Sequence, residues 1–428
     1  MNASIFSLFL FVTVLVAQEK PADPYFDKYL PTPAPKPERL LLEKGDRLAI
    51  CGDSITEQKM YSRVMETYLT VCVPELEVSV RQYGWGGEKA PGFLRRMTND
   101  VLRFKPTIAT TCYGMNDHEY RDYEERIGNQ YRDASRAIIR AFKYHGVRVV
   151  HGSPGPVGKV PHWTKSDSYS KEQLNLNLLN LRNIGVELAN EEKVGFADVF
   201  WPMFVSEHLA RKQYGEDYAV AGKDGVHPGW AGSFIMAYSF LKALGLDGEL
   251  GSFTLDLASN QVKPSEGHRV LSSRAGIFEV ESSRYPFCAP KGDPRNDDSI
   301  LSGMTLVPFN RELNRFMLRI RNPEAARYKV TWGESSKSFD AAVLKEGINL
   351  AAEFPQNPFS EAFAKVDEAV GAKQAYETRQ IKMLFHGEEG RADKDLTATL
   401  TEKARAPLVK AIQAQFRPVT HTIRVEAE

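Results

Sequence analysis

The feature that most constrains the fold is a regular alternation, between residues 46 and 250, of short apolar runs and longer amphipathic stretches. The short runs have the length and composition of buried strands, and the longer stretches have the spacing of helices. Strands that alternate with helices favour a parallel sheet with helices on both faces, so we predict a three-layer α/β fold. The expected strands are Arg47–Cys51, Glu77–Tyr83, Thr107–Tyr113, Val147–Gly152 and Val194–Phe200. The expected helices are 57–71, 90–104, 122–145, 170–192 and 230–244.

The segments on either side of this region have different patterns. Residues 18–45 contain six prolines and no periodicity, which predicts an extended leader lying against the following domain. Residues 251–350 contain short alternating stretches, which predict an accessory region of antiparallel strands. Residues 351–428 predict helices, and the one expected over 394–416 should be interrupted or kinked at Pro407. The alternating residues are Phe316, Leu318, Ile320, Tyr328, Val330 and Trp332, and those at helical spacing are Phe359, Phe363, Val366 and Val370.

The N-terminus predicts export. The apolar run Ile5–Val16 has the length of a signal-peptide core and ends in Leu15-Val16-Ala17, so we expect a signal peptide over residues 1–17 and a secreted or periplasmic protein. An N-terminal membrane anchor is the alternative, although the run is short for a bilayer. No later segment has the length of a transmembrane helix, so we expect no integral membrane span after signal removal.

Charge and cysteine content exclude several classes of protein. Lys plus Arg and Asp plus Glu both number 55, so the formal net charge is zero and nucleic acid is not an expected partner. The four cysteines form no CxxC motif and no Cys/His cluster, so neither a metal site nor a redox motif is expected. Cys51 and Cys112 lie in predicted strands and suit buried apolar positions, whereas a disulfide involving Cys72 or Cys288 stays open.

The first motif with chemical potential is Gly52-Asp53-Ser54-Ile55, directly after the first predicted strand. A serine at the carboxyl end of such a strand can face a cleft, and the N-terminus of the following helix stabilises negative charge beside it. An ordinary strand–turn–helix junction, with Asp53 and Ser54 serving as turn and cap residues, is the alternative.

Three further motifs lie at strand ends or in the last loop of the α/β region. A glycine of Tyr83–Glu88 can bring a backbone N–H close to a reacting oxygen, and Asn116 of Gly114–Asp117 can donate its side-chain amide there. In Asp224-Gly225-Val226-His227-Pro228 the carboxylate lies three residues before the imidazole and can orient it. Each motif alone is explained as well by turn chemistry. Together they supply a nucleophile, a base, a group that orients the base and two oxyanion donors at one sheet edge.

The four motifs, in this order and at this spacing, resemble the conserved blocks of the SGNH (GDSL) hydrolase family over roughly residues 46–245. The resemblance implies a three-layer α/β/α, flavodoxin-like domain with a five-stranded parallel sheet, and the activity of a serine esterase. It implies that Ser54 is the nucleophile, that His227 is the base and that Asp224 orients it.

The same resemblance implies an oxyanion site. The N–H groups of Ser54 and Gly87 and the amide of Asn116 would bind the oxyanion, although the tandem Gly86-Gly87 leaves open which glycine donates. No metal or organic cofactor is expected for this chemistry.

The substrate is less constrained than the reaction. Trp85, His162 and Trp163 lie in strand-end loops and could stack on sugar rings, although core or loop packing explains them equally well. Export and accessory regions favour an acetyl esterase acting on polysaccharide. A lipase or thioesterase of the same fold and a non-catalytic envelope or glycan-binding protein are the alternatives.

Overall fold

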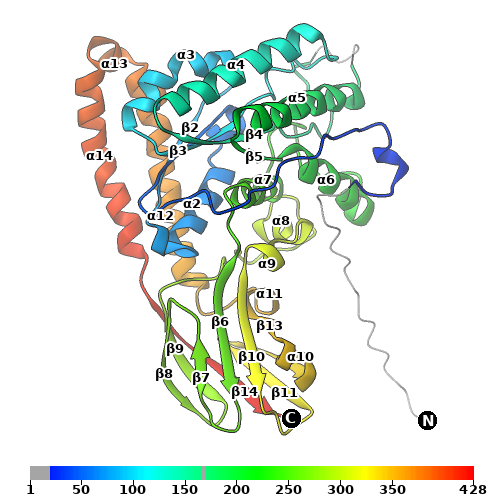
Figure 1. Cartoon of the computed structure of the whole chain (residues 1–428), viewed down its shortest axis with the longest axis vertical. Helices are drawn as coiled ribbons and strands as arrows, with labels where there is room; N and C mark the ends of the chain where they lie inside the picture. The colour runs from blue at the N-terminus through cyan, green and yellow to red at the C-terminus, as the bar shows by residue number, and fades with distance from the viewer. Residues whose placement is uncertain (1–19, 165–168) are drawn as a thin grey trace.

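The computed structural model describes residues 20–164 and 169–428. The predicted signal peptide lies outside these residues. The described chain consists of an α/β body, a β-rich unit below it and a group of C-terminal helices packed along one side of the body (Figure 1).

The α/β body is built on a five-stranded, all-parallel sheet in the order β2-β1-β3-β4-β5. This is the flavodoxin-like order, and it confirms the predicted fold class. The strands are β1 (Arg47–Gly52), β2 (Ser79–Gly84), β3 (Ile108–Cys112), β4 (Arg148–Gly152) and β5 (Gly195–Ala197). Leu48 and Ile50 of β1 join one apolar cluster, and Ala49 and Cys51 join another on the opposite face.

Helices cover both faces of the sheet. The helices are α1 (Ser54–Glu57), α2 (Tyr61–Val71), α3 (Ala90–Asp100), α4 (Glu125–Tyr144), α5 (Lys171–Glu192), α6 (Phe200–Tyr214) and α7 (Trp230–Ala243). The single helix predicted over 57–71 is two helices, because Lys59 between them has a φ of 61°. Helix α6 was not predicted, because its N-terminal half is apolar all round and buried and therefore lacks an amphipathic period.

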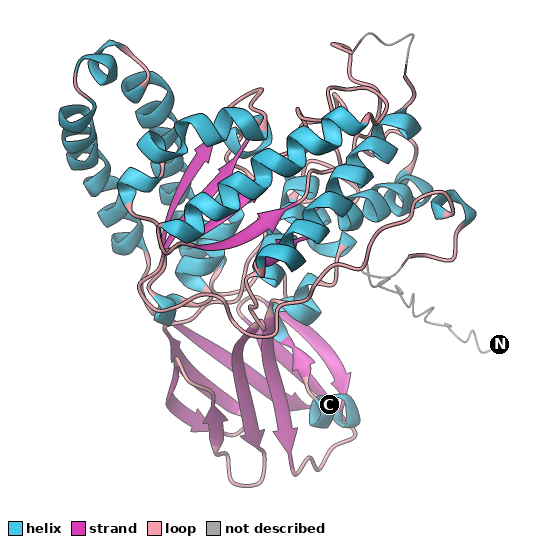
Figure 2. Cartoon of the chain, turned by 45° about the horizontal axis from the view of Figure 1, so that its top comes forward, coloured by secondary structure: helices cyan, strands magenta, loops and turns pink. Residues whose placement is uncertain are grey.

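The β-rich unit contains two sheets, in the orders β13-β10-β6-β7 and β12-β11-β14-β9-β8; Figure 2 shows these strands gathered below the helices. The predicted strands around Phe316 and Tyr328 exist as β10 and β11, but they belong to different sheets, and β10 runs parallel to β6. The expectation of purely antiparallel strands was therefore wrong for β10. The strands are β6 (Glu249–Asp256), β7 (Val262–Pro264), β8 (His268–Arg274), β9 (Ile277–Ser282), β10 (Arg315–Arg321), β11 (Arg327–Trp332), β12 (Ser335–Asp340) and β13 (Ile348–Asn349); short helices α8 (Ile300–Leu306), α9 (Phe309–Glu312), α10 (Ala341–Glu346) and α11 (Leu350–Glu353) connect them.

The C-terminal region returns to the α/β body before the chain ends. It consists of α12 (Ser360–Arg379), a π-helical turn η5 (Gln380–Phe385), α13 (Glu388–Ala392), α14 (Lys394–Gln415) and β14 (Val419–Ala427). The helices lie along the body, and β14 then crosses back to pair with β9 and β11 (Figure 1). Region 351–428 is therefore mostly helical but also supplies a strand to the β-rich unit. Helix α14 runs through Pro407 without the expected interruption.

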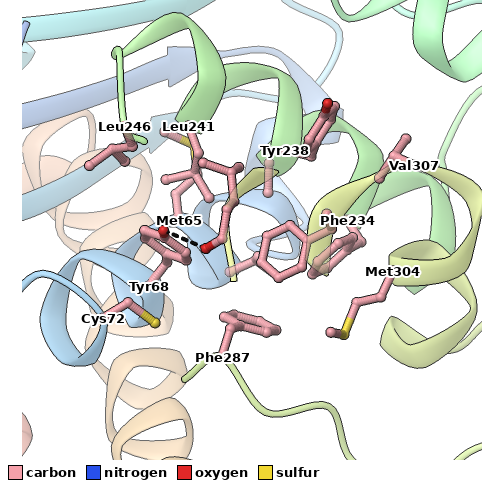
Figure 3. Close-up of a cluster of buried hydrophobic side chains, with 14 of the residues drawn as sticks. Met65, Tyr68, Cys72, Phe234, Tyr238, Leu241, Leu246, Phe287, Met304 and Val307 are labelled. Atoms are coloured by element: carbon pink, nitrogen blue, oxygen red, sulfur yellow. Dashed lines mark hydrogen bonds between the residues drawn. The ribbon is translucent and has the colours of Figure 1, made fainter. Parts of the chain in front are cut away.

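One buried core connects the body to the β-rich unit. Figure 3 shows part of it, where side chains of α2 and α7 meet Phe287 and the α8 region. Tyr68 of α2 also donates a hydrogen bond of 2.7 Å to the carbonyl of Leu313. All four cysteines are buried and free, so the disulfide left open for Cys72 and Cys288 is not formed.

The leader packs against α6. Phe26 and Tyr29 are fully buried, and the rings of Tyr29 and Phe204 lie 4.5 Å apart. The His208 ring stacks on Tyr25 at 4.1 Å. Among the described residues, no helix combines the length and apolar character needed to cross a membrane.

Candidate active site

The turn after β1 presents Ser54 at the carboxyl edge of the sheet. Asp53 caps α1, because its carboxylate accepts the Ile55 N–H at 3.0 Å. Ser54 is the first residue of that helix and is only half-buried. The cap therefore fixes the backbone while the serine hydroxyl stays accessible.

His227 connects Ser54 to Asp224. Its Nε2 lies 2.8 Å from the Ser54 Oγ, and its Nδ1 lies 2.7 Å from the Asp224 Oδ2. A carboxylate can only accept, so Nδ1 carries the proton of a neutral imidazole and Nε2 is free to accept the hydroxyl proton of Ser54. The arrangement has the geometry of a nucleophile, a base and a group that orients the base.

The Asp224 carboxylate is held by its own loop. Its Oδ1 accepts the N–H groups of Val226 at 2.9 Å and His227 at 2.8 Å. Burial opposes ionisation of Asp224, but these hydrogen bonds and the His227 ring outweigh it and lower the pKa of the carboxyl. Asp224 is therefore charged at neutral pH and available to the imidazole.

The loop after β2 contains the candidate glycine donors. The Gly86 N–H donates to the Glu57 carboxylate. The Gly87 N–H has no hydrogen-bond partner within the described part of the chain, and the residue has a φ of 71°, which favours glycine. Of the two glycines, Gly87 is therefore the one with an N–H available to an oxyanion.

Asn116 follows β3 and is half-buried. Its Nδ2 lies 3.1 Å from the Glu88 carbonyl and 3.4 Å from the Asp53 carboxylate, and the Tyr120 hydroxyl donates to its Oδ1 at 3.4 Å. These contacts orient the amide with its nitrogen toward the turns that carry Ser54 and Gly87. Burial raises the pKa of Asp53 to about 7. The hydrogen bond from the Ile55 N–H lowers this pKa, whereas the nearby charges of Asp117 and Glu88 raise it further.

Aromatic residues lie on the base side of the site. The Trp163 ring is 42% exposed and lies 6.0 Å from the His227 ring. Tyr120 meets Trp163 edge-to-face at 5.9 Å, and the ring of the exposed His162 meets the indole edge-to-face at 4.9 Å. Of the predicted pair His162 and Trp163, Trp163 therefore lies next to His227, and His162 contacts Trp163.

Trp85 has a different environment. The guanidinium of Arg96 and the ammonium of Lys382 lie over its ring at 5.1 and 5.3 Å, and the His386 ring meets it edge-to-face at 4.8 Å. These neighbours favour a role for Trp85 in holding the loop rather than in contacting a sugar.

Sequence reasoning missed the side chains that support the oxyanion loop. Glu57, Tyr120, Lys382 and His386 lie outside the four motifs, and the last two come from the C-terminal region. Of these four residues, only Glu57 could have been suspected from the sequence, because it lies three residues after Ser54. Within residues 20–164 and 169–428, no group of three or more His, Cys, Asp or Glu side chains could hold a metal ion.

Comparison with known proteins gives a consistent picture. A gut microbial diltiazem-metabolizing enzyme has a similar structure, with a TM-score of 0.71 and 21% sequence identity over 91% of this chain and 100% of that one. The same combination of α/β body, β-rich unit and C-terminal helices therefore occurs in another protein. An acetylxylan esterase from Geobacillus stearothermophilus is 18% identical, with a TM-score of 0.39 over 48% of this chain and 97% of that one. No curated protein matches the sequence.

The family comparison covers the α/β body. Residues 50–233 match the GDSL-like Lipase/Acylhydrolase family. This span begins within β1 and ends in α7, so it includes Ser54, Gly87, Asn116, Asp224 and His227. The chain therefore carries a GDSL-like lipase/acylhydrolase domain over residues 50–233 and is a hydrolase that acts on esters.

Proposed function

We propose that the protein hydrolyses carboxylic esters through an acyl-enzyme formed on Ser54. The observation that carries this proposal is the pair of short contacts on His227, 2.8 Å to Ser54 Oγ and 2.7 Å to Asp224 Oδ2. A serine hydroxyl is a weak nucleophile unless an oriented base removes its proton, and this geometry provides that base.

In the first half of the reaction, Ser54 Oγ attacks the ester carbonyl while its proton passes to His227 Nε2. The carbonyl oxygen becomes an oxyanion, which the Ser54 and Gly87 N–H groups and the Asn116 amide bind. The Asp224 carboxylate stabilises the imidazolium. Collapse of the tetrahedral intermediate breaks the ester C–O bond, and the imidazolium returns the proton to the leaving alkoxide.

In the second half, water attacks the acyl-Ser54 carbonyl while His227 Nε2 takes one of its protons. The same donors bind the second oxyanion. Collapse then releases the carboxylic acid, and Ser54 regains its proton from the imidazolium.

We propose an acetyl ester on a polysaccharide as the substrate. The leaving alkoxide receives its proton from His227, so the alcohol part of the ester lies on the base side of the site. Trp163 is on that side, 6.0 Å from the imidazole and 42% exposed. A flat, half-exposed indole suits stacking against a sugar ring that serves as the leaving group.

The test is hydrolysis of p-nitrophenyl acetate, butyrate and octanoate, and of acetylated xylan, by wild type and Ser54→Ala. We expect activity on acetate, less on octanoate, acetate release from the xylan and loss of all three in the variant. A preference for octanoate would instead support a lipase or thioesterase. Equal rates for wild type and variant on every ester would contradict the serine mechanism and leave a non-catalytic, glycan-binding role.

We also propose that the protein is exported. The support is the apolar run Ile5–Val16 and the small residue Ala17 after it. N-terminal sequencing of the mature protein from its native host should begin just after Ala17. A mature chain that still begins at Met1 would contradict cleavage.

A further inference from the structure

The C-terminal helices cover the open edge of the parallel sheet. Strand β2 is an edge strand, and its outer backbone groups face α12 and α14. The Val80 carbonyl accepts hydrogen bonds from Lys373 and, at 3.0 Å, from Arg405, and the Gln82 N–H donates to Glu377 at 3.2 Å. Side chains of the C-terminal region thus replace the missing neighbour strand.

The docking of α12 is specified by buried charges. The Lys373 ammonium is 1% exposed and lies 2.9 Å from Glu66 of α2 and 2.8 Å from Glu377. Arg405 of α14 also contacts Glu377, at 2.7 Å. Buried charges are tolerated only when each is paired, so this network fixes α12 in one position against β2 and α2.

Because α12 is fixed, the turn that follows it reaches the oxyanion loop. The π-helical turn Gln380–Phe385 lies beside β2, since Arg81 of that strand donates a hydrogen bond of 3.1 Å to Gln380. From this turn Lys382 Nζ contacts both carboxylate oxygens of Glu57, at 2.7 and 2.9 Å, and lies over the Trp85 ring. Turns of π-helix often occur at functional sites.

Glu57 connects this lysine to both parts of the site. It is the last residue of the four-residue helix that Ser54 begins, and its carboxylate also accepts the Gly86 N–H. A Cβ atom added at Gly87 would have nothing within 4 Å, so this part of the loop borders open space. The direction of the Gly87 N–H therefore depends on the anchors beside it, and Glu57 is one of them.

We propose that Lys382 is a positioning residue for ester hydrolysis: it holds Glu57, which holds the Gly86 N–H, so that the Gly87 N–H points at the oxyanion. This inference rests on the function proposed above. It gives the C-terminal region a part in the reaction through its contact with Glu57 of the α/β body.

A role in positioning predicts kinetic effects without a loss of stability. The Lys382 and Glu57 side chains are 27% and 25% exposed. Water still reaches both side chains, so losing this ion pair should cost much less stability than losing one of the buried Lys373 pairs. An oxyanion donor, in contrast, acts in the transition state, so its misplacement lowers kcat and leaves KM unchanged.

The experiment compares Lys382→Met, Lys382→Arg and Glu57→Gln in the full chain. We expect Lys382→Met to lower kcat for p-nitrophenyl acetate by about 10- to 100-fold with KM within about twofold, since a fully lost donor costs about 10²–10³. Lys382→Arg should restore most of the rate. Glu57→Gln combined with Lys382→Met should lose no more than the worse single variant, because both act through one contact.

The matched control is Asp395→Asn. Asp395 joins α14 to the α/β body through Arg103, away from the oxyanion loop, and is 88% exposed. We expect this variant to retain wild-type kcat, as surface substitutions do, and all variants to retain the wild-type melting temperature within about 4 °C. Ser54→Ala, assayed beside them, reports on the proposed function itself.

Four results would overturn the inference. Lys382→Met with wild-type kcat, or Asp395→Asn with an equal loss, would show that Lys382 does not position the loop, and Ser54→Ala would still report the serine mechanism. A loss of kcat accompanied by a large fall in melting temperature would show a structural role. If Ser54→Ala equals wild type, the proposed function fails and this inference fails with it.

Discussion

The two halves of the candidate site are supported by different parts of the chain. The half proposed to activate Ser54 depends on two loops of the α/β body, and the Asp224 carboxylate is held by N–H groups within three residues of it. The half proposed to bind the oxyanion depends on the loop after β2, whose anchors include Lys382 and His386 of the C-terminal region. Local structure thus positions the proposed base, His227, whereas long-range contacts position the proposed oxyanion donors.

The largest expected effect tests the local half. Asp224→Asn keeps an oxygen for the loop N–H groups but presents an amide to His227, which reverses the imidazole tautomer. We expect kcat on p-nitrophenyl acetate to fall by about 10³–10⁴-fold with little change in stability. A loss below about tenfold would mean that Asp224 does not orient the base.

The second-largest expected effect tests the half of the site proposed to bind the oxyanion. Asn116→Ala removes a side-chain donor and should lower kcat by about 10²–10³-fold with KM nearly unchanged, measured by steady-state kinetics on the same ester. The loss should exceed that of Lys382→Met, because Asn116 would touch the oxyanion itself. An Asn116→Ala variant with a wild-type rate would remove this residue from the oxyanion site.

A third prediction concerns Asp53, which contacts both halves. Its folded pKa, about 7, is above the ordinary value of 3.8, so folding takes up a proton between these limits. Its contribution to stability is therefore greatest below pH 4, falls as pH rises to about 7 and then stays constant.

Asp53→Asn removes this titration and keeps an acceptor for the Ile55 N–H. The free energy of unfolding of the variant minus that of wild type should increase by roughly 2 kcal/mol from pH 5 to pH 7. Urea unfolding at each pH measures this difference. A difference that does not change with pH would show that Asp53 ionises normally in the folded protein.

The smallest expected effect concerns the alcohol side of the substrate. Trp163→Ala should raise KM for an acetylated xylo-oligosaccharide by about 2- to 10-fold and leave p-nitrophenyl acetate hydrolysis unchanged, since stacking on an aromatic ring contributes about 0.5–1.5 kcal/mol. Tyr144→Ala is the control, because Tyr144 is 88% exposed at the end of α4, outside the site. Equal KM values for the two variants would argue against sugar stacking.

The same division, between features held by local contacts and features held by long-range contacts, separates what the sequence could predict from what it could not. The strand–helix alternation predicted all five strands of the parallel sheet, because burial on both faces gives short apolar runs. The four motifs predicted which residues meet at its edge, and the structure brings Ser54, Asp224 and His227 into contact. These features depend on local pattern and on the rule that parallel strands end at one edge.

The features that the sequence could not predict depend on long-range packing. Strand β10 has an alternating pattern, but nothing in that pattern shows that its partner is β6 or that the pairing is parallel. Lys382 lies 325 residues from Glu57, and neither residue belongs to a motif. Only the docking of α12 on β2 brings them together.

The most direct test of the central claim is covalent labelling of the nucleophile. The wild-type protein and His227→Ala are treated with a small alkyl fluorophosphonate, and the modified peptide is identified by mass spectrometry. We predict a single adduct on Ser54 in wild type and little or none in His227→Ala, because the imidazole activates the hydroxyl. No adduct on Ser54, or an adduct on a different serine, would contradict the account.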